Sequence, residues 1–340
     1  MNGWQFNDNI VNNIITMRIG YIDALKGIAI ILVVLGHMIQ YVFCPNDYSD
    51  NIIFRYIYSF HMGFFMALSG FTVRTYHDSF QSVLRQIDKR AVNLILPFIS
   101  WALLGYYLMD GVDLPTVFKR TDCGLWFLYA LFVIYTIFQL AIFPVRNCKK
   151  AIRYFVLGIA YLMLHEVTAK HLLPIETYWA LAHFPNFCLG YIIADNKEII
   201  LKRSNFKLLL LTIPLYFLLA TLWRQTLTES ILTKIASSWV YGSIIVLLTT
   251  LSFFWLAMRF EKTLKAFKLE IIGRLTLGIY AIHQPLIGLR EYLPDSCFFF
   301  FANYILGGAI LFTIVMVVSI IFVRLLSTTK FTSILFLGKY

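Results

Sequence analysis

The chain has 340 residues, of which 59% are hydrophobic, 17% aromatic and only 14% charged. Soluble domains carry roughly a quarter charged residues, so this composition and a mean hydropathy of +0.73 exclude a disordered, fibrous or ordinary cytosolic protein. The five cysteines form no CxxC pair and no histidine–cysteine cluster with zinc spacing, which argues against a disulfide scaffold and a metal site. The composition predicts a polytopic membrane protein.

Long apolar runs separated by charged residues predict an all-α bundle of about ten transmembrane helices. The Asn-rich residues 1–17 contain no Lys or Arg, so they make a poor signal peptide and are expected to form a polar tail. We expect residues 18–330 to form one transmembrane domain and residues 331–340 a short C-terminal tail. The predicted spans are residues 21–43, 52–72, 91–109, 124–143, 151–165, 177–194, 207–223, 236–258, 271–290 and 298–326.

Lys and Arg residues separate sharply between alternate loops. All but seven of the 29 fall on one side, which the positive-inside rule makes cytoplasmic, together with both termini. The net charge of +11 is then mostly explained by the cations of the cytoplasmic loops, and it does not indicate nucleic-acid binding. The seven exceptions are Arg55, Lys119, Arg120, Lys170, Arg224, Lys234 and Arg290.

The first predicted span carries three ionisable residues on one helical face: Asp23, Lys26 and His37. Lys26 would lie near the cytoplasmic entry, with His37 roughly 16 Å deeper, beside Gly36. A histidine at this depth can serve as a proton acceptor, or it can be a structural residue bonded to a neighbouring carbonyl. The spacing alone leaves both interpretations open.

The second span contributes His61 at mid-span and a small patch, Ser69 and Gly70, that suits close helix packing. Arg74 follows at the predicted cytoplasmic end, where an isolated arginine usually extends to lipid headgroups. Together with Arg90 and its basic neighbours it forms a dense cationic loop. Such a loop can hold the phosphates of a nucleotide-like cofactor or bind anionic lipids.

Later spans add aromatic and histidine residues that packing alone would also explain. Trp126 begins the fourth span, as expected of an interfacial aromatic residue. His183 and its neighbours give the sixth span a polar, interrupted start that suits a cavity wall. In the ninth span Tyr280 and His283 lie three residues apart on one face.

An ordered series of blocks resembles the membrane-bound acyltransferase 3 family of O-acyltransferases. The first is a basic residue followed by ten residues and a histidine, with an acidic residue just before the cation. The second resembles the family's F-H-M-P-x-F-F-x-x-S-G-F segment, with Gly63 where proline is common. The matching residues are Asp23, Lys26 and His37; Phe60–Phe71; Arg90 with Leu96 and Pro97; Leu125–Leu128; and Tyr280, His283 and Pro285.

The resemblance implies transfer of an acyl group, usually acetyl, from acetyl-CoA or another acyl-CoA to a hydroxyl of a surface glycan or lipid-linked sugar. It also implies a multi-pass protein of the plasma (inner) membrane, with the donor on the cytoplasmic side. No hydrolase-like domain follows the last predicted span, so we expect a single-domain version of the family. No metal is expected, and the partners are the glycan acceptor and membrane lipids.

The resemblance also suggests roles for individual residues. His37 would be the general base or, as an alternative, a transient acyl carrier, and Asp23 would orient a partner or stabilise positive charge. Lys26, Arg74 and Arg90 would contact the donor phosphates or stabilise charge on the thioester oxygen. Five further residues are expected to line the substrate cavity: His61, Ser69, Trp126, Tyr280 and His283.

The sequence is also compatible with two other functions. A proton-coupled transporter or exporter would use the same histidines as a relay, and it should show matching halves with paired broken helices. No such internal repeat is present in the sequence. A non-enzymatic scaffold would bind no donor and would not depend on His37.

Overall fold

The structure is a computed structural model that describes residues 20–44, 46–75, 77–108, 125–172, 177–224, 238–289 and 305–339. The expected polar tail of residues 1–17 lies outside these ranges, as do the loop cations Lys119, Arg120, Lys234 and Arg290.

The described residues fold into helices joined by short turns, and no strand occurs among them. The expectation of an all-α bundle is therefore confirmed. The elements are α2 (Gly20–Met38), η1 (Ile39–Phe43), η2 (Tyr48–Asp50), α3 (Ile52–Tyr58), α4 (His61–Phe71), α5 (Phe80–Leu108), α7 (Trp126–Val145), α8 (Lys150–Ala169), α9 (Tyr178–Asp195), α10 (Lys197–Ile200), η3 (Arg203–Leu208), α11 (Leu209–Leu222), α13 (Trp239–Arg259), α14 (Glu261–Ala266), α15 (Leu269–Arg274), α16 (Thr276–Gly288), α18 (Ile305–Leu326) and α19 (Lys330–Leu337).

Within the described ranges, seven helices are long and apolar enough to cross a membrane. Three further predicted spans coincide with α5, α9 and α16, which are helical but fall outside that set. The count of about ten spans therefore stays a prediction, as does the side on which the termini lie. The seven candidates are Gly20–Phe43, Ile52–Phe71, Trp126–Val145, Lys150–Ala169, Asn205–Leu222, Val240–Arg259 and Leu306–Leu326.

Several helix boundaries differ from those expected from hydropathy. The span expected at 52–72 is interrupted at Ser59 and Phe60, between α3 and α4. Helix α5 begins at Phe80, well before the expected residue 91, because its first turns are amphipathic rather than apolar. In the expected C-terminal tail, α19 packs against α5, where the Trp101 indole N–H donates to the carbonyl of Phe336 at 3.0 Å.

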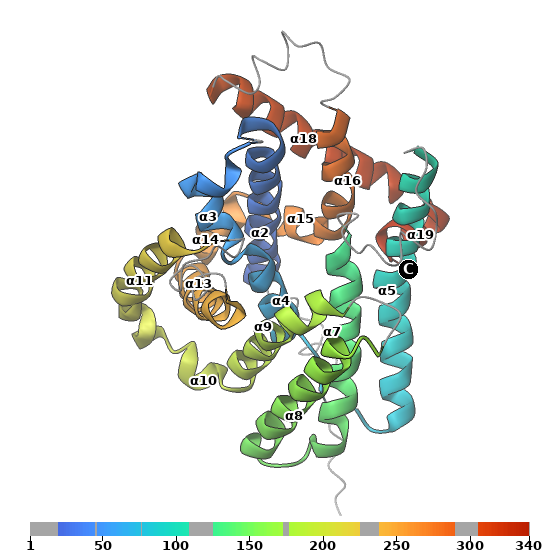
Figure 1. Cartoon of the computed structure of the whole chain (residues 1–340), viewed down its shortest axis with the longest axis vertical. Helices are drawn as coiled ribbons and strands as arrows, with labels where there is room; N and C mark the ends of the chain where they lie inside the picture. The colour runs from blue at the N-terminus through green and yellow to red at the C-terminus, as the bar shows by residue number, and fades with distance from the viewer. Residues whose placement is uncertain are drawn as a thin grey trace, which may run out of the picture.

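The site is built on a ring of five helices: α2, α4, α9, α7 and α16. Helix α2 packs against α4 and α16, and α9 packs against α4 and α7. The ring closes where the Phe127 side chain of α7 meets Tyr280 of α16, with ring centroids 5.7 Å apart. Figure 1 shows α2 upright at the centre, with α4, α9 and α7 below and beside it.

Glycines permit two very close helix crossings, one within this ring and one where α15 meets α2. A Cβ atom on Gly70 would collide with the carbonyl of Phe187, and one on Gly190 with the carbonyl of Ala67, so α4 and α9 meet backbone to backbone. A side chain on Gly273 would likewise collide with the carbonyl of Asp23, where α15 crosses α2. Glycine is required at these positions because no other residue allows the backbones so close.

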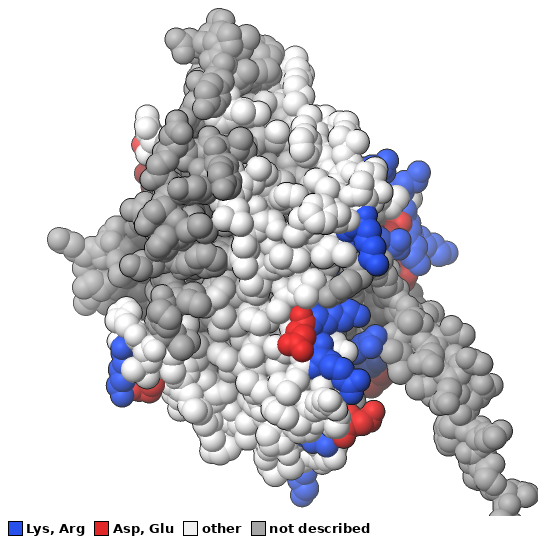
Figure 2. Space-filling view, turned by 90° about the vertical axis from the view of Figure 1, so that its right-hand side faces the viewer, with Lys and Arg blue, Asp and Glu red and all other residues white. Residues whose placement is uncertain are grey.

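Large apolar side chains cover the outside of the bundle. Phe155 on α8, Leu210 on α11 and Val240 on α13 are 70%, 84% and 73% exposed. Figure 2 shows a broad uncharged area on one face, with most of the visible Lys and Arg residues gathered along one edge. Exposed apolar area on this scale is typical of helices that contact lipid.

Candidate functional site

The structure pairs two histidines from distant parts of the sequence. His37, near the end of α2, and His283, in α16, have Nδ1 and Nε2 atoms 2.7 Å apart. Their rings are nearly parallel, with an interplanar angle of 17°. His283 is fully buried, whereas His37 is half-buried and retains some access to its surroundings.

The hydrogen bonds define which nitrogens carry protons. His283 Nδ1 lies 2.9 Å from the carbonyl oxygen of Ile279, which can only accept, so Nδ1 must carry the hydrogen. In the neutral ring Nε2 of His283 is then an acceptor, and Nδ1 of His37 must donate to it. With both rings neutral, Nε2 of His37 is left with a free lone pair. This is the arrangement of a general base held by a second residue.

Aromatic side chains surround the half-buried face of His37. The ring centroids of Tyr41 and Tyr58 lie 5.8 and 6.0 Å from the centroid of the His37 imidazole. Gly36 lets the Tyr58 ring approach α2, because a Cβ there would lie 2.6 Å from the ring. His61 is buried and packs on Tyr58 at 4.6 Å, while its own Nδ1 lies 3.0 Å from the Ile57 carbonyl.

A second feature is a cavity of about 90 Å³ on the α4 side of the ring. Two of its lining residues, Lys26 and Arg90, are half-buried cations from different helices, and the Arg90 guanidinium lies over the Tyr135 ring at 5.0 Å. The expected residues Lys26, Ser69 and Arg90 thus share one cavity. The full lining is Lys26, Ser69, Thr72, Arg90, Leu94, Leu131, Tyr135 and Phe187.

The cavity and the histidine pair are connected along α2. Lys26 and His37 share a helical face and lie eleven positions apart, which corresponds to about 16 Å at 1.5 Å per residue. A cationic cavity at one end of this face and a proton acceptor at the other suit an elongated anionic ligand with its reactive end near His37.

Two of the residues expected to act in catalysis or donor binding, Arg74 and Asp23, lie elsewhere. Arg74 is exposed and does not line the cavity, and its carbonyl accepts a hydrogen bond from Gln139 Nε2 at 2.8 Å. Asp23 lies at the crossing with α15, where its carboxylate is 3.6 Å from Arg274 Nε. It is about 21 Å along the helix from His37, so the structure does not bring these two residues together.

Trp126 belongs to an aromatic cluster that the sequence did not group. Its indole stacks on Trp179 at 4.5 Å and on the His183 imidazole at 5.4 Å. Sequence analysis missed Trp179 and His183 as partners of Trp126, although their spacing of four residues places them on one face of α9. Tyr135 and Thr72 were also missed as cavity residues.

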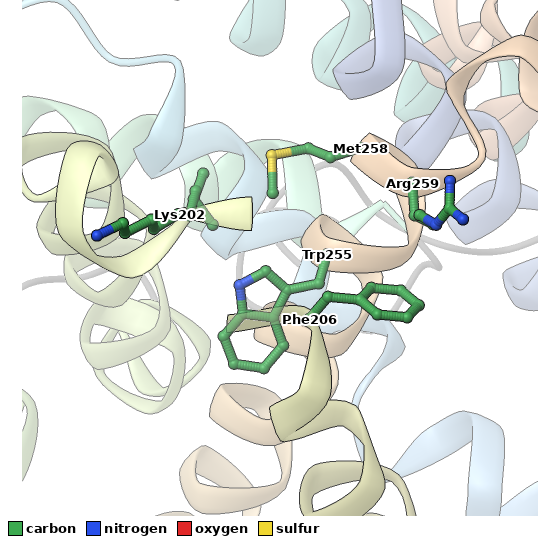
Figure 3. Close-up of a pocket in the computed structure, with 6 residues that line it drawn as sticks. Lys202, Phe206, Trp255, Met258 and Arg259 are labelled. Atoms are coloured by element: carbon green, nitrogen blue, oxygen red, sulfur yellow. The ribbon is translucent and has the colours of Figure 1, made fainter. Parts of the chain in front are cut away.

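A larger hollow of about 200 Å³ lies away from these residues, between η3 and α13. Figure 3 shows Trp255 and Phe206 at its centre, with Lys202 and Arg259 at opposite sides. The side chains of both cations point away from the aromatic residues. None of the expected site residues lines it, so we place the candidate site at His37 and the cavity of Lys26.

In the described part of the chain, no group of three or more His, Cys, Asp or Glu residues is arranged to hold a metal ion. Asp23, three residues before Lys26, forms an ion pair with Arg274. The ionisable groups that the structure places at the candidate site are the imidazoles of His37 and His283 and the cations Lys26 and Arg90.

Comparison with known proteins finds two curated nodulation proteins that are similar to part of the chain. The nodulation protein NolL of Sinorhizobium fredii (strain NBRC 101917 / NGR234) is 33% identical over 199 residues, covering 52% of this chain and 49% of that protein. NolL of Mesorhizobium japonicum (strain LMG 29417 / CECT 9101 / MAFF 303099) is 26% identical over 190 residues, covering 51% and 47%. The chain spans about half the length of these curated relatives, and no solved structure matches it.

A family model described as an acyltransferase domain matches residues 19–324, which include the helices that carry the histidine pair, the cavity and the aromatic cluster. This match covers most of the chain and confirms the resemblance inferred from the ordered blocks. The chain belongs to the acyltransferase 3 family.

Proposed function

We propose that the chain transfers a short acyl group, acetyl in the first instance, from acyl-coenzyme A to a hydroxyl of a surface glycan or lipid-linked sugar, in the plasma (inner) membrane. The observation that carries the proposal is the hydrogen-bonded pair of His37 and His283, which leaves Nε2 of His37 as a base. Family membership supports acyl transfer as the reaction class.

His37 acts as the general base. As the acceptor oxygen attacks the thioester carbonyl carbon, its proton moves to Nε2 of His37. The carbon–sulfur bond then breaks, the new ester is released, and the coenzyme A thiolate takes the proton back from His37. During this exchange the ring is an imidazolium, and its Nδ1–H bond to His283 becomes charge-assisted and stronger.

Lys26 and Arg90 bind the phosphates of the donor. Both line one cavity, and Arg90 presents the planar fork that suits phosphate. The distance of about 16 Å from Lys26 to His37 along α2 is comparable to the extended phosphopantetheine arm of coenzyme A. A donor held by its phosphates in the cavity would therefore place its thioester near His37.

The test uses membranes from cells that express the chain, incubated with acetyl-CoA carrying a labelled acetyl group. Wild type should transfer label to glycan or lipid-linked sugar as a base-labile ester. His37→Ala should lower this transfer by about 10² to 10⁴-fold, the usual contribution of a general base. His165→Ala is the matched control, because His165 is 55% exposed on α8. Equal transfer by wild type and His37→Ala would contradict the proposal.

A further inference from the structure

Trp126, Trp179 and His183 form one stack of nearly parallel rings, which we call the aromatic platform. The indole rings are 4.5 Å apart with an interplanar angle of 25°. The His183 imidazole is tilted by 14° from the Trp126 indole, with ring centroids 5.4 Å apart. It is tilted by 13° from the Trp179 indole, with ring centroids 6.4 Å apart. All three side chains are half-buried, so the platform is fixed by packing and still accessible.

The platform also carries polar edges. The amide Nδ2 of Asn186 lies 3.3 Å from Nδ1 of His183 and can only donate, so Nδ1 is the acceptor. The hydrogen of the neutral imidazole is then on Nε2, which is a donor toward the surroundings. Within the described ranges no protein acceptor takes the N–H of either indole, although buried or bound indoles usually find one. The platform therefore combines flat apolar faces with hydrogen-bond donors.

A series of contacts links the platform to the histidine pair. Helix α4 is the common reference, because Tyr58, just before it, meets Gly36, and Gly63, in its first turn, lies against Asn186. Ring contacts also link the two features: Trp126 to Phe127 at 6.2 Å, Phe127 to Tyr280 at 5.7 Å, and Tyr280 to His283 at 6.0 Å.

The same face of α9 leads from the platform to the cationic cavity. Trp179, His183 and Phe187 follow one another at intervals of four residues, and Phe187 lines the cavity with Lys26. In Figure 1, α7 and α9 lie side by side below α2. One face of α9 therefore carries two residues of the platform and, one turn further on, a residue of the cationic cavity.

Interfacial tryptophans that anchor a helix in the membrane contact headgroups individually. These two instead stack on each other and on a histidine, and Trp126 packs against the buried core of the bundle. Aromatic faces combined with a few fixed polar groups are typical of small-molecule binding sites. Sugars present both a flat C–H face and hydroxyl groups, which match the two kinds of surface.

We infer that the aromatic platform is the acceptor subsite, which binds a pyranose ring of the glycan or lipid-linked sugar with its C–H face on the indoles and a hydroxyl on His183. This inference rests on the proposed function, and it adds the residues that select and orient the acceptor. Trp126, Trp179 and His183 bind the acceptor, and His37 takes its proton.

The experiment measures label transfer from acetyl-CoA to sugar in membranes, and in parallel the rise in melting temperature that coenzyme A causes in the purified protein. Trp179→Ala and Trp126→Ala should each lower transfer by about two- to tenfold, because that is the change in affinity expected from the loss of one aromatic ring contact. Trp179→Phe keeps an aromatic face and should retain most of the transfer. All three variants should keep the coenzyme A stabilisation of wild type, because the donor cavity is intact.

Trp101→Ala is the matched control, since Trp101 is a half-buried tryptophan of α5 that packs on Phe336 of α19, outside the platform. It should transfer as wild type does. Wild-type transfer by Trp179→Ala would overturn the inference. So would equal losses in Trp179→Ala and Trp179→Phe together with loss of the coenzyme A effect, which would indicate a purely structural role. If wild type itself transfers no label to sugar, the proposed function fails and the inference falls with it.

Discussion

Replacing His283 by alanine tests the histidine pair most specifically, because the residue does not face solvent. Its Nε2 lies 2.7 Å from Nδ1 of His37 and is fully buried. The substitution removes the acceptor that fixes the orientation and tautomer of His37. A hydrogen bond to a group that becomes charged contributes about 1.5 to 3 kcal/mol. We therefore expect kcat to fall by about 10- to 150-fold.

The pattern across kinetic constants distinguishes positioning from general damage. The KM for acyl-coenzyme A should stay near the wild-type value, because the donor cavity lies about 16 Å away along α2. His283→Gln retains an amide oxygen that can accept from His37, so it should recover a large part of the activity. Radiolabel transfer at varied donor concentration gives both constants, and thermal unfolding checks that the variants are folded. A folded His283→Ala protein with kcat within twofold of wild type would refute the reasoning.

Three further predictions concern donor binding, packing and topology. Arg90→Ala should raise the KM for acyl-coenzyme A about tenfold, whereas Arg74→Ala, outside the cavity, should change it by less than about twofold in the same kinetic assay. Gly190→Val should abolish stable expression because its side chain would collide with an α4 carbonyl, whereas Gly158→Ala, which faces open space, should leave the melting temperature unchanged. In a single-cysteine variant, the exposed Cys148 should react with a membrane-impermeant maleimide only after cells are permeabilised; labelling of intact cells would reverse the predicted topology.

The helical architecture and part of the site follow from the sequence because both depend on local properties. Apolar runs predict membrane helices, and helical periodicity places Lys26 and His37 on one face. The structure places three of the expected residues, Lys26, Ser69 and Arg90, around one cavity, and their roles stay predictions. Gly70 was expected to permit close packing, and it does so against α9.

The pairing of the helices could not be read from one sequence. His37 and His283 are 246 residues apart, and periodicity indicates which face of a helix is polar but not which helix it meets. Arg74 was grouped with Arg90 because both lie in one basic stretch, yet α5 carries Arg90 to the cavity and leaves Arg74 exposed. From the sequence, Trp126 was expected to be an aromatic residue at the membrane interface. Its stacking on Trp179, which only the structure shows, makes it part of the aromatic platform.

The early start of α5 has a similar explanation. Its first three turns are charged, so a search for apolar runs begins the helix too late. These turns are amphipathic, and their apolar face is explained by the packing of α5 against α7, which the sequence alone does not show. That same segment places Arg90 beside Tyr135.

Mass spectrometry of surface glycans and lipid-linked sugars tests the central claim most directly, using cells that express wild type or His37→Ala at equal levels. The account predicts that one acyl mass, 42 Da for acetyl, is present with wild type and absent with His37→Ala, while the amount of glycan stays the same. An identical acyl content in both would contradict it. A change in glycan amount without a change in acyl mass would instead indicate an exporter.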